Sequence, residues 1–129
     1  MPFVTVGAII EKEGKILFLK RNHEPFKDCW GLPGGKVEDG ETVEEAVIRE
    51  IKEETNLDLT NPKFMFYHNE IYKDKGWFGI ALFFTGNFSG EIKLSHEHTK
   101  YDWFTIEEIR EMKIAFKNKE GIERYLEMK

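Results

Sequence analysis

Cysteine is almost absent from this chain of 129 residues, since Cys29 is the only one. No intramolecular disulfide can form, and we interpret Cys29 as a small apolar residue rather than a nucleophile. The first residues lack the basic start and cleavage signal of a secretory peptide, and no apolar run approaches the length of a membrane span. These absences predict a cytoplasmic protein with no membrane partner.

Positive charge is also scarce, because 19 Lys and Arg residues face 24 Asp and Glu residues. A formal net charge of −5 argues against a broad basic face for a long nucleic acid. The acidic residues are concentrated between positions 36 and 58, and the rest of the chain is nearly neutral. This acidic block indicates a site for cations.

Hydrophobic and aromatic residues are plentiful, at 40% and 14% of the chain. This composition excludes a disordered protein. The length suits one domain with its own core, and no linker, repeat or low-complexity segment divides it. We therefore expect a single domain over residues 1–129.

The sequence pattern predicts alternating strands and helices, and therefore helices packed on a mixed sheet. Thr42 and Glu45 form a capping box before the clearest helix, 43–55, and Asn56 suits the residue that follows it. A second capping box opens a helix from Thr105 to about Met112. Strands are expected at 3–10, 15–20, 63–73, 77–86 and 100–104. A turn at 11–14 would join the first two strands into a hairpin. A strand edge is expected at 91–94 and a last helix at 118–127.

The helix 43–55 carries its acidic residues on an unusual side. At 100° per residue, Glu50, Glu53 and Glu54 overlap the apolar stripe instead of lying opposite to it. Repulsion between like charges, burial and the helix dipole all oppose this arrangement. A divalent cation such as Mg²⁺ or Mn²⁺ would reverse these three effects, whereas solvated surface glutamates are the alternative interpretation.

Residues 35–57 read Gly35, five residues, Glu41, seven residues, and then Arg49-Glu50-Ile51-Lys52-Glu53-Glu54-Thr55-Asn56-Leu57. This string resembles the Nudix box, the signature of the Nudix (MutT-like) hydrolases. Every fixed position matches except the last glycine, where Asn56 stands. Asparagine is the next best residue after glycine in a left-handed conformation, so the difference concerns the helix end rather than the chemistry.

The resemblance implies an α/β fold, the Nudix α/β/α sandwich with a mixed sheet between helices and a loop–helix–loop catalytic motif. It also implies hydrolysis of a phosphoanhydride in a nucleoside diphosphate linked to another group, with Mg²⁺ as cofactor and Mn²⁺ as a substitute. The expected partner is a small nucleotide substrate, and members of the family are often homodimers.

The resemblance implies a role for each residue of the box. The expected metal ligands are the backbone carbonyl of Gly34 and the side chains of Glu50, Glu53 and Glu54. A further acid, Glu97, is expected as a metal ligand or as the general base. The expected structural support of the site comes from Gly35, Glu41 and Arg49.

The identity of the general base stays open among Glu50, Glu53 and Glu97, which are the expected catalytic residues. His96 and His98 flank Glu97 in the sequence, but no cysteine pair or third histidine supports a zinc site. We therefore interpret both as ordinary loop histidines.

Substrate-binding residues are less well marked. Lys20 and Arg21 end a strand near the box and could hold phosphate. Tyr72 and Trp77 could stack on a base, as could Phe3 and Phe78, although core packing is the commoner role of such residues.

The substrate class is inferred by elimination. The proline that marks the ADP-ribose subgroup is missing at its expected place, since the only later proline, Pro62, lies too close to the box. We expect a small MutT-like nucleoside triphosphate pyrophosphohydrolase that releases a monophosphate and pyrophosphate. The alternatives are an ADP-ribose or dinucleoside polyphosphate pyrophosphatase and, in another class, a nucleotide sensor without activity.

Overall fold

The computed structural model describes residues 2–129. Its longer sheet has the strand order β5-β1-β7-β6, in which β1 and β7 are parallel and the other neighbours are antiparallel. The strands are β1 (Phe3–Ala8), β5 (Gly34–Lys36), β6 (Asp58–Tyr72) and β7 (Trp77–Ser89). A single 3₁₀ turn, η1 (Lys73–Lys75), joins β6 to β7. Buried residues alternate with more exposed ones from Phe78 to Phe83 of β7, as is usual in a half-buried strand.

A second sheet is built around the strand β3 (Lys15–Arg21), which pairs with three others. Its partners are β2 (Glu11–Lys12), β4 (Trp30–Gly31) and β8 (His98–Phe104). The expected hairpin between 3–10 and 15–20 is therefore wrong, because β1 belongs to the longer sheet. The chain leaves that sheet after Ala8, and Glu11–Lys12, expected as a turn, form the strand that pairs with β3.

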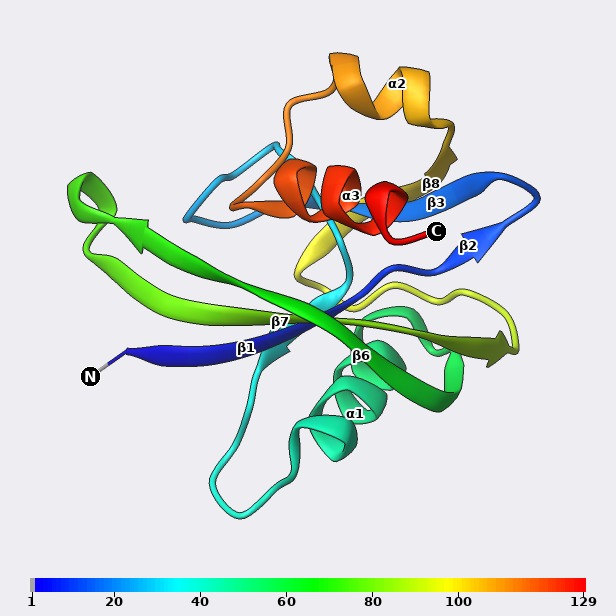
Figure 1. Cartoon of the computed structure of the whole chain (residues 1–129), viewed down its shortest axis with the longest axis horizontal. Helices are drawn as coiled ribbons and strands as arrows, with labels where there is room; N and C mark the ends of the chain where they lie inside the picture. Colours follow the sequence, from blue (N-terminus) through cyan, green and yellow to red (C-terminus); the bar gives the residue numbers. More distant parts are fainter. Residues whose placement is uncertain (1) are drawn as a thin grey trace.

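Helices cover both faces of the longer sheet (Figure 1). Helix α1 (Val43–Thr55) lies on one face and α3 (Asn118–Glu127) on the other, whereas α2 (Ile106–Glu111) lies farther out, beyond α3 and toward β8. Two apolar clusters correspond to these layers. Ala46, Val47 and Ile51 of α1 pack with one, and Ile109 and Ile122 of the later helices pack with the other. The α/β/α arrangement expected from the sequence is confirmed.

Both capping boxes are present. Thr42 and Glu45 exchange side-chain to backbone hydrogen bonds, and Thr105 and Glu108 do the same at α2. Asn56 ends α1 in the left-handed region, with φ at 68°. These local signals are strong because each one satisfies backbone N–H groups that a helix end leaves unpaired.

Two further observations complete the fold. Residues 91–94, expected at a strand edge, form no strand, although the Lys93 amide donates to the Thr55 carbonyl at 2.8 Å. Between residues 2 and 129, no helix is long and apolar enough to cross a membrane.

Candidate active site at the junction of helix α1 and the two sheets

Strand β5 runs directly against the C-terminal half of helix α1. The Gly34 amide donates a hydrogen bond to Glu54 Oε1 at 2.7 Å. Gly35 lies against the carboxyl group of Glu50, and a Cβ at this position would come within 2.3 Å of Glu50 Oε2. A side chain at position 35 would therefore displace the carboxyl group of Glu50, and the supporting role of Gly35 stays a prediction.

Arg49 connects the loop before the helix to the acidic side of the helix. Its guanidinium donates to both carboxylate oxygens of Glu41, at 2.8 and 2.7 Å. It also donates to Glu50 at 2.8 Å, to Glu53 at 3.0 Å and to the carbonyl of Lys36 at 3.0 Å. The hydrogen bond from Arg49 lowers the pKa of Glu41 to about 2. The predicted pairing of Glu41 with Arg49 is therefore present in the fold.

Glu54 and Glu50 are removed from water to different degrees. Glu54 is only 8% exposed, and burial raises the pKa of its carboxyl group well above the ordinary value, although the Gly34 amide opposes this. Burial also raises the pKa of Glu50, while Arg49 acts to lower it. The charge of Glu97 contributes to raising both pKa values. Glu50 and Glu54 therefore share a poorly solvated region, and the exposed Glu97 adds a third negative charge beside them.

This donor set fits a hard divalent cation. Glu50, Glu54 and Glu97 all line one cavity, together with Gly34 and Gly35. In residues 2–129 no three acidic, histidine or cysteine side chains are already gathered at metal-binding distances. Arg49 instead contacts Glu50 and Glu53. Oxygen-rich, negatively charged sites with unfavourable burial are those that Mg²⁺ and Mn²⁺ stabilise.

Glu53 differs from the other acids of the helix. Its side chain is 52% exposed, contacts Arg49 and does not line the cavity. A role for Glu53 in metal binding therefore stays a prediction.

The loop before β8 brings Glu97 to the cavity. Asn22 holds this loop, because its backbone amide donates to the Glu97 carbonyl at 3.2 Å and its side chain donates to the His96 carbonyl at 2.8 Å. His98 follows at the start of β8, and its side chain is 5% exposed. Its Nε2 lies 3.9 Å from Glu54 Oε2. His96 is an exposed loop residue as expected, but His98 is a buried wall of the site.

His98 carries no charge near neutral pH. Burial, followed by the charge of Arg21, lowers the pKa of the ring to about 4. Its contact with Glu54 is therefore not an ion pair.

The cavity has a volume of about 470 Å³ and extends from the acidic cluster along the longer sheet. Arg21 and Trp77 line it, as predicted for substrate-binding residues. Trp77 packs on Phe3 and Phe116 with ring centroids 4.9 and 5.3 Å apart. The Arg21 guanidinium lies 5.1 Å from the Phe116 ring and donates through Nε to the Pro25 carbonyl at 2.8 Å.

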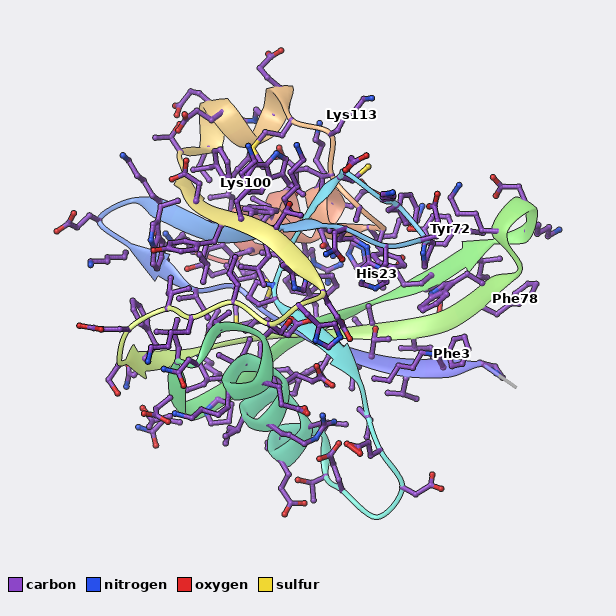
Figure 2. The ribbon with its side chains drawn as sticks, turned by 180° about the vertical axis from the view of Figure 1, so that it is seen from behind. Phe3, His23, Tyr72, Phe78, Lys100 and Lys113 are labelled. Atoms are coloured by element: carbon purple, nitrogen blue, oxygen red, sulfur yellow. The ribbon has the colours of Figure 1, made fainter. Side chains whose placement is uncertain are left out.

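Two other predicted substrate residues do not line the cavity. Lys20 pairs with Trp30 and Lys100 inside the second sheet, just before a register shift at Arg21. Tyr72 lies behind the cavity wall, and its hydroxyl donates to Glu70 Oε2 at 2.7 Å. Figure 2 shows Tyr72, Phe78 and Phe3 toward the η1 end of the longer sheet. Phe78 is 46% exposed and is absent from the cavity lining.

Sequence reasoning missed several residues of the cavity wall. The most unusual is Glu70, a carboxylate that is 2% exposed and lies on β6. Alternation along β6 places Glu70 on the same side as buried Phe66, and this signal could have identified it. Other missed wall residues include Lys36, Phe116 and Asn118, together with His98.

Comparisons with known proteins agree on one family. The family model described as the NUDIX domain matches residues 1–125. The chain is 40% identical over 129 residues to an ADP-ribose pyrophosphatase of Methanocaldococcus jannaschii, covering 99% of this chain and 75% of that protein. It is 30% identical to a CTP pyrophosphohydrolase of Escherichia coli, covering 85% and 81%. A NUDIX hydrolase structure from Nitrosomonas europaea superposes with a TM-score of 0.91 at 26% identity, covering 100% of this chain and 91% of that one.

Proposed function

This chain belongs to the Nudix hydrolase family, and we propose that it cleaves the phosphoanhydride bond of a nucleoside diphosphate linked to a sugar, with ADP-ribose as the first candidate. A pyrophosphohydrolase activity on phosphorus-containing anhydrides is what this membership implies. The observation that supports the proposal best is the cavity itself. Its acidic end is formed by Glu50, Glu54 and Glu97, and it continues to aromatic side chains.

In this proposal a divalent cation, Mg²⁺ or Mn²⁺, is bound by Glu50, Glu54, Glu97 and the carbonyl of Gly34. Glu53 supplies a further carboxylate from the same helix. When bound, the cation would neutralise phosphate oxygens and acidify a water molecule. Burial raises the pKa values of Glu50 and Glu54, and a bound cation would offset this effect by favouring their ionised forms.

The protein's own residues then divide the remaining work. Arg49 donates hydrogen bonds to Glu50 and Glu53, and its own side chain does not line the cavity. Arg21 presents a guanidinium to the cavity and suits the phosphate chain of the substrate. A general base removes a proton from the attacking water, and Glu50, Glu53 and Glu97 stay the candidates.

The order of the substrate candidates differs from the one expected from the missing downstream proline. ADP-ribose comes first because the relative of that activity is 40% identical over nearly the whole chain. A nucleoside triphosphate such as CTP is the second candidate, since a CTP pyrophosphohydrolase is 30% identical over 85% of the chain. Residues 1–129 act as a single domain in either case, and a homodimer remains a prediction for sedimentation analysis.

The test is product release with Mg²⁺ from ADP-ribose, the four nucleoside triphosphates and diadenosine polyphosphates. We expect ADP-ribose to give AMP and ribose 5-phosphate with the highest kcat/KM. Turnover of triphosphates alone would select the second candidate. If none of these compounds is cleaved but nucleotides bind, the chain is a sensor and the proposal fails.

The general base is tested with three variants, Glu50→Gln, Glu53→Gln and Glu97→Gln. Loss of the base removes the acidic limb of the pH–rate profile, whereas loss of a metal ligand raises the Mg²⁺ concentration that is needed for half activity. The variant that changes the profile at saturating Mg²⁺ identifies the base.

A further inference from the structure

One buried carboxylate lies in the cavity but far from the acidic cluster. Glu70 is 2% exposed, lies near the C-terminal end of β6 and lines the cavity wall. Its hydrogen-bond partners, Tyr72 and Lys117, both lie outside the Nudix box. Burying a carboxylate is costly unless its oxygens are hydrogen-bonded, so its presence in this wall requires an explanation.

The strand register places Glu70 at the opposite end of the cavity. Gly7 pairs with Gly34 beside the acidic cluster, and four residues earlier on the same strand Phe3 pairs with Gly79. Gly79 in turn pairs with Glu70 on β6. Four residues of a strand span roughly 13 Å. Glu70 is therefore about this far along the sheet from the phosphate end, which suits the base of a nucleotide whose diphosphate lies at the glutamates.

The aromatic side chains at this end also fit a base. Trp77 and Phe116 line the cavity close to Glu70, and their rings pack against each other with centroids 5.3 Å apart. Aromatic faces favour stacking with any base, so they do not select among bases. Selection requires a polar group that is directed at the edge of the ring, and the wall near these aromatics contains Glu70.

The carboxylate of Glu70 is held in place but is not saturated. The Tyr72 hydroxyl donates to Oε2 at 2.7 Å, and the backbone amide of Lys117 donates to Oε1 at 3.3 Å. An ionised carboxylate has about four acceptor positions, so two remain for a ligand. Both existing donors come from outside the cavity and fix the orientation of the group.

We propose that Glu70 is a specificity-determining residue that accepts a hydrogen bond from an exocyclic amino group of the substrate base and so favours adenine and cytosine nucleotides over uracil nucleotides. The proposal rests on the proposed function and narrows its substrate class. Carboxylates accept from the amino group of cytosine, whereas uracil presents a carbonyl oxygen at the same position. Two acceptors facing each other in a dry pocket disfavour binding. The raised pKa of Glu70, caused by burial, agrees with a group that lacks a donor on this side.

The alternative is that Glu70 only ties β6 to the loop before α3 through Lys117. Such a role would affect all nucleotides equally. Binding of AMP, CMP and UMP to the whole chain by titration calorimetry separates the two roles, because it requires no turnover. The variant is Glu70→Gln, and the matched control is Glu111→Gln, an exposed glutamate on α2 outside the cavity.

We expect the Glu70→Gln variant to bind AMP and CMP about 10- to 100-fold more weakly, with UMP unchanged or tighter, because the new amide can donate to a carbonyl oxygen. The KM for ADP-ribose should rise with little change in kcat. The control variant should behave as the unmodified protein. An equal change for all three monophosphates, no change, or no preference in the unmodified protein would overturn the assignment.

Tyr72→Phe provides a second variant if Glu70→Gln does not fold. It removes the hydroxyl that orients Oε2 and keeps the ring, so the preference for AMP over UMP should fall by a few fold. An unchanged preference here would contradict the assignment. Binding selectivity without hydrolysis of any substrate would reject the proposed function and leave the role of Glu70 supported.

Discussion

Arg49 contacts the carboxyl groups of Glu41, Glu50 and Glu53 at once, and this geometry depends on a planar guanidinium. Lysine carries the same charge but cannot make the paired bonds to Glu41. We expect Arg49→Lys to lower kcat/KM by 10- to 100-fold while the fold is kept. Steady-state kinetics together with circular dichroism measures both properties. Wild-type activity in this variant would show that the contacts do not orient the site.

His98 gives a prediction about pH. Its pKa of about 4 in the folded protein lies below the ordinary value of 6.5, so between these values the unfolded chain binds more protons. The contribution of His98 to the free energy of unfolding is therefore complete above pH 6.5 and is lost as the pH falls toward 4. Urea unfolding at several pH values should show this decline in the unmodified protein and a smaller decline in His98→Gln. Equal slopes would mean that burial does not hold the ring neutral.

Helix α1 ends at Asn56 with a positive φ of 68°, and its side chain donates to the Glu91 carbonyl at 3.2 Å. Asn56→Ala should reduce the free energy of unfolding by about 1–2 kcal/mol, because a Cβ without a local hydrogen bond is strained in this conformation. Chemical denaturation measures the change. Asn56→Gly is the control, since glycine removes the same side chain without strain. If both variants lose equal stability, the hydrogen bond to Glu91 explains the effect.

Elements that are defined by local chemistry were predicted well. Helix α1, both capping boxes and the long β6–β7 pair follow from periodicity and from the first residues of each helix. The hairpin predicted between 3–10 and 15–20 was wrong, because the pairing of a strand depends on which sheet it joins. That choice is made by distant partners, here β7 for β1 and β8 for β3, and no local signal encodes it.

The same distinction holds for the site. The box placed Glu50, Glu54 and Gly35 at the cavity, since their spacing is fixed by one helix and one short strand. Residues from other elements were harder to place. Glu70 and His98 become functional candidates only when β6 and β8 are brought against the cavity, which the order of residues alone does not show.

Burial of the carboxylates of the acidic cluster destabilises the folded protein, so we expect a bound divalent cation to stabilise the entire fold. A cation that binds only the native state stabilises it by about 2.7 kcal/mol at a concentration of 100 times the Kd. For a domain of this size we expect Mg²⁺ or Mn²⁺ to raise Tm by roughly 10 °C under these conditions, and chelator to reverse the change. Differential scanning calorimetry measures the shift.

Glu54→Gln serves as the control for this experiment. It removes the most buried charge of the cluster, so the metal-free variant should melt at the same or a higher temperature than the unmodified protein. The shift caused by metal should largely disappear. A full shift in this variant would mean that the cation binds elsewhere, and no shift in the unmodified protein would remove the metal from the proposed mechanism.

The packing of β5 on helix α1 also has a consequence for a complete survey of single substitutions, because it makes Gly35 differ from the nearby Gly40. At Gly35 any side chain would displace the carboxyl group of Glu50, so replacements there should score as losses of activity. At Gly40 the surroundings are open and only the positive φ of 80° is restrictive, so asparagine and aspartate should survive there. Two glycines five positions apart would thus give different mutational profiles, one set by space and the other by backbone conformation.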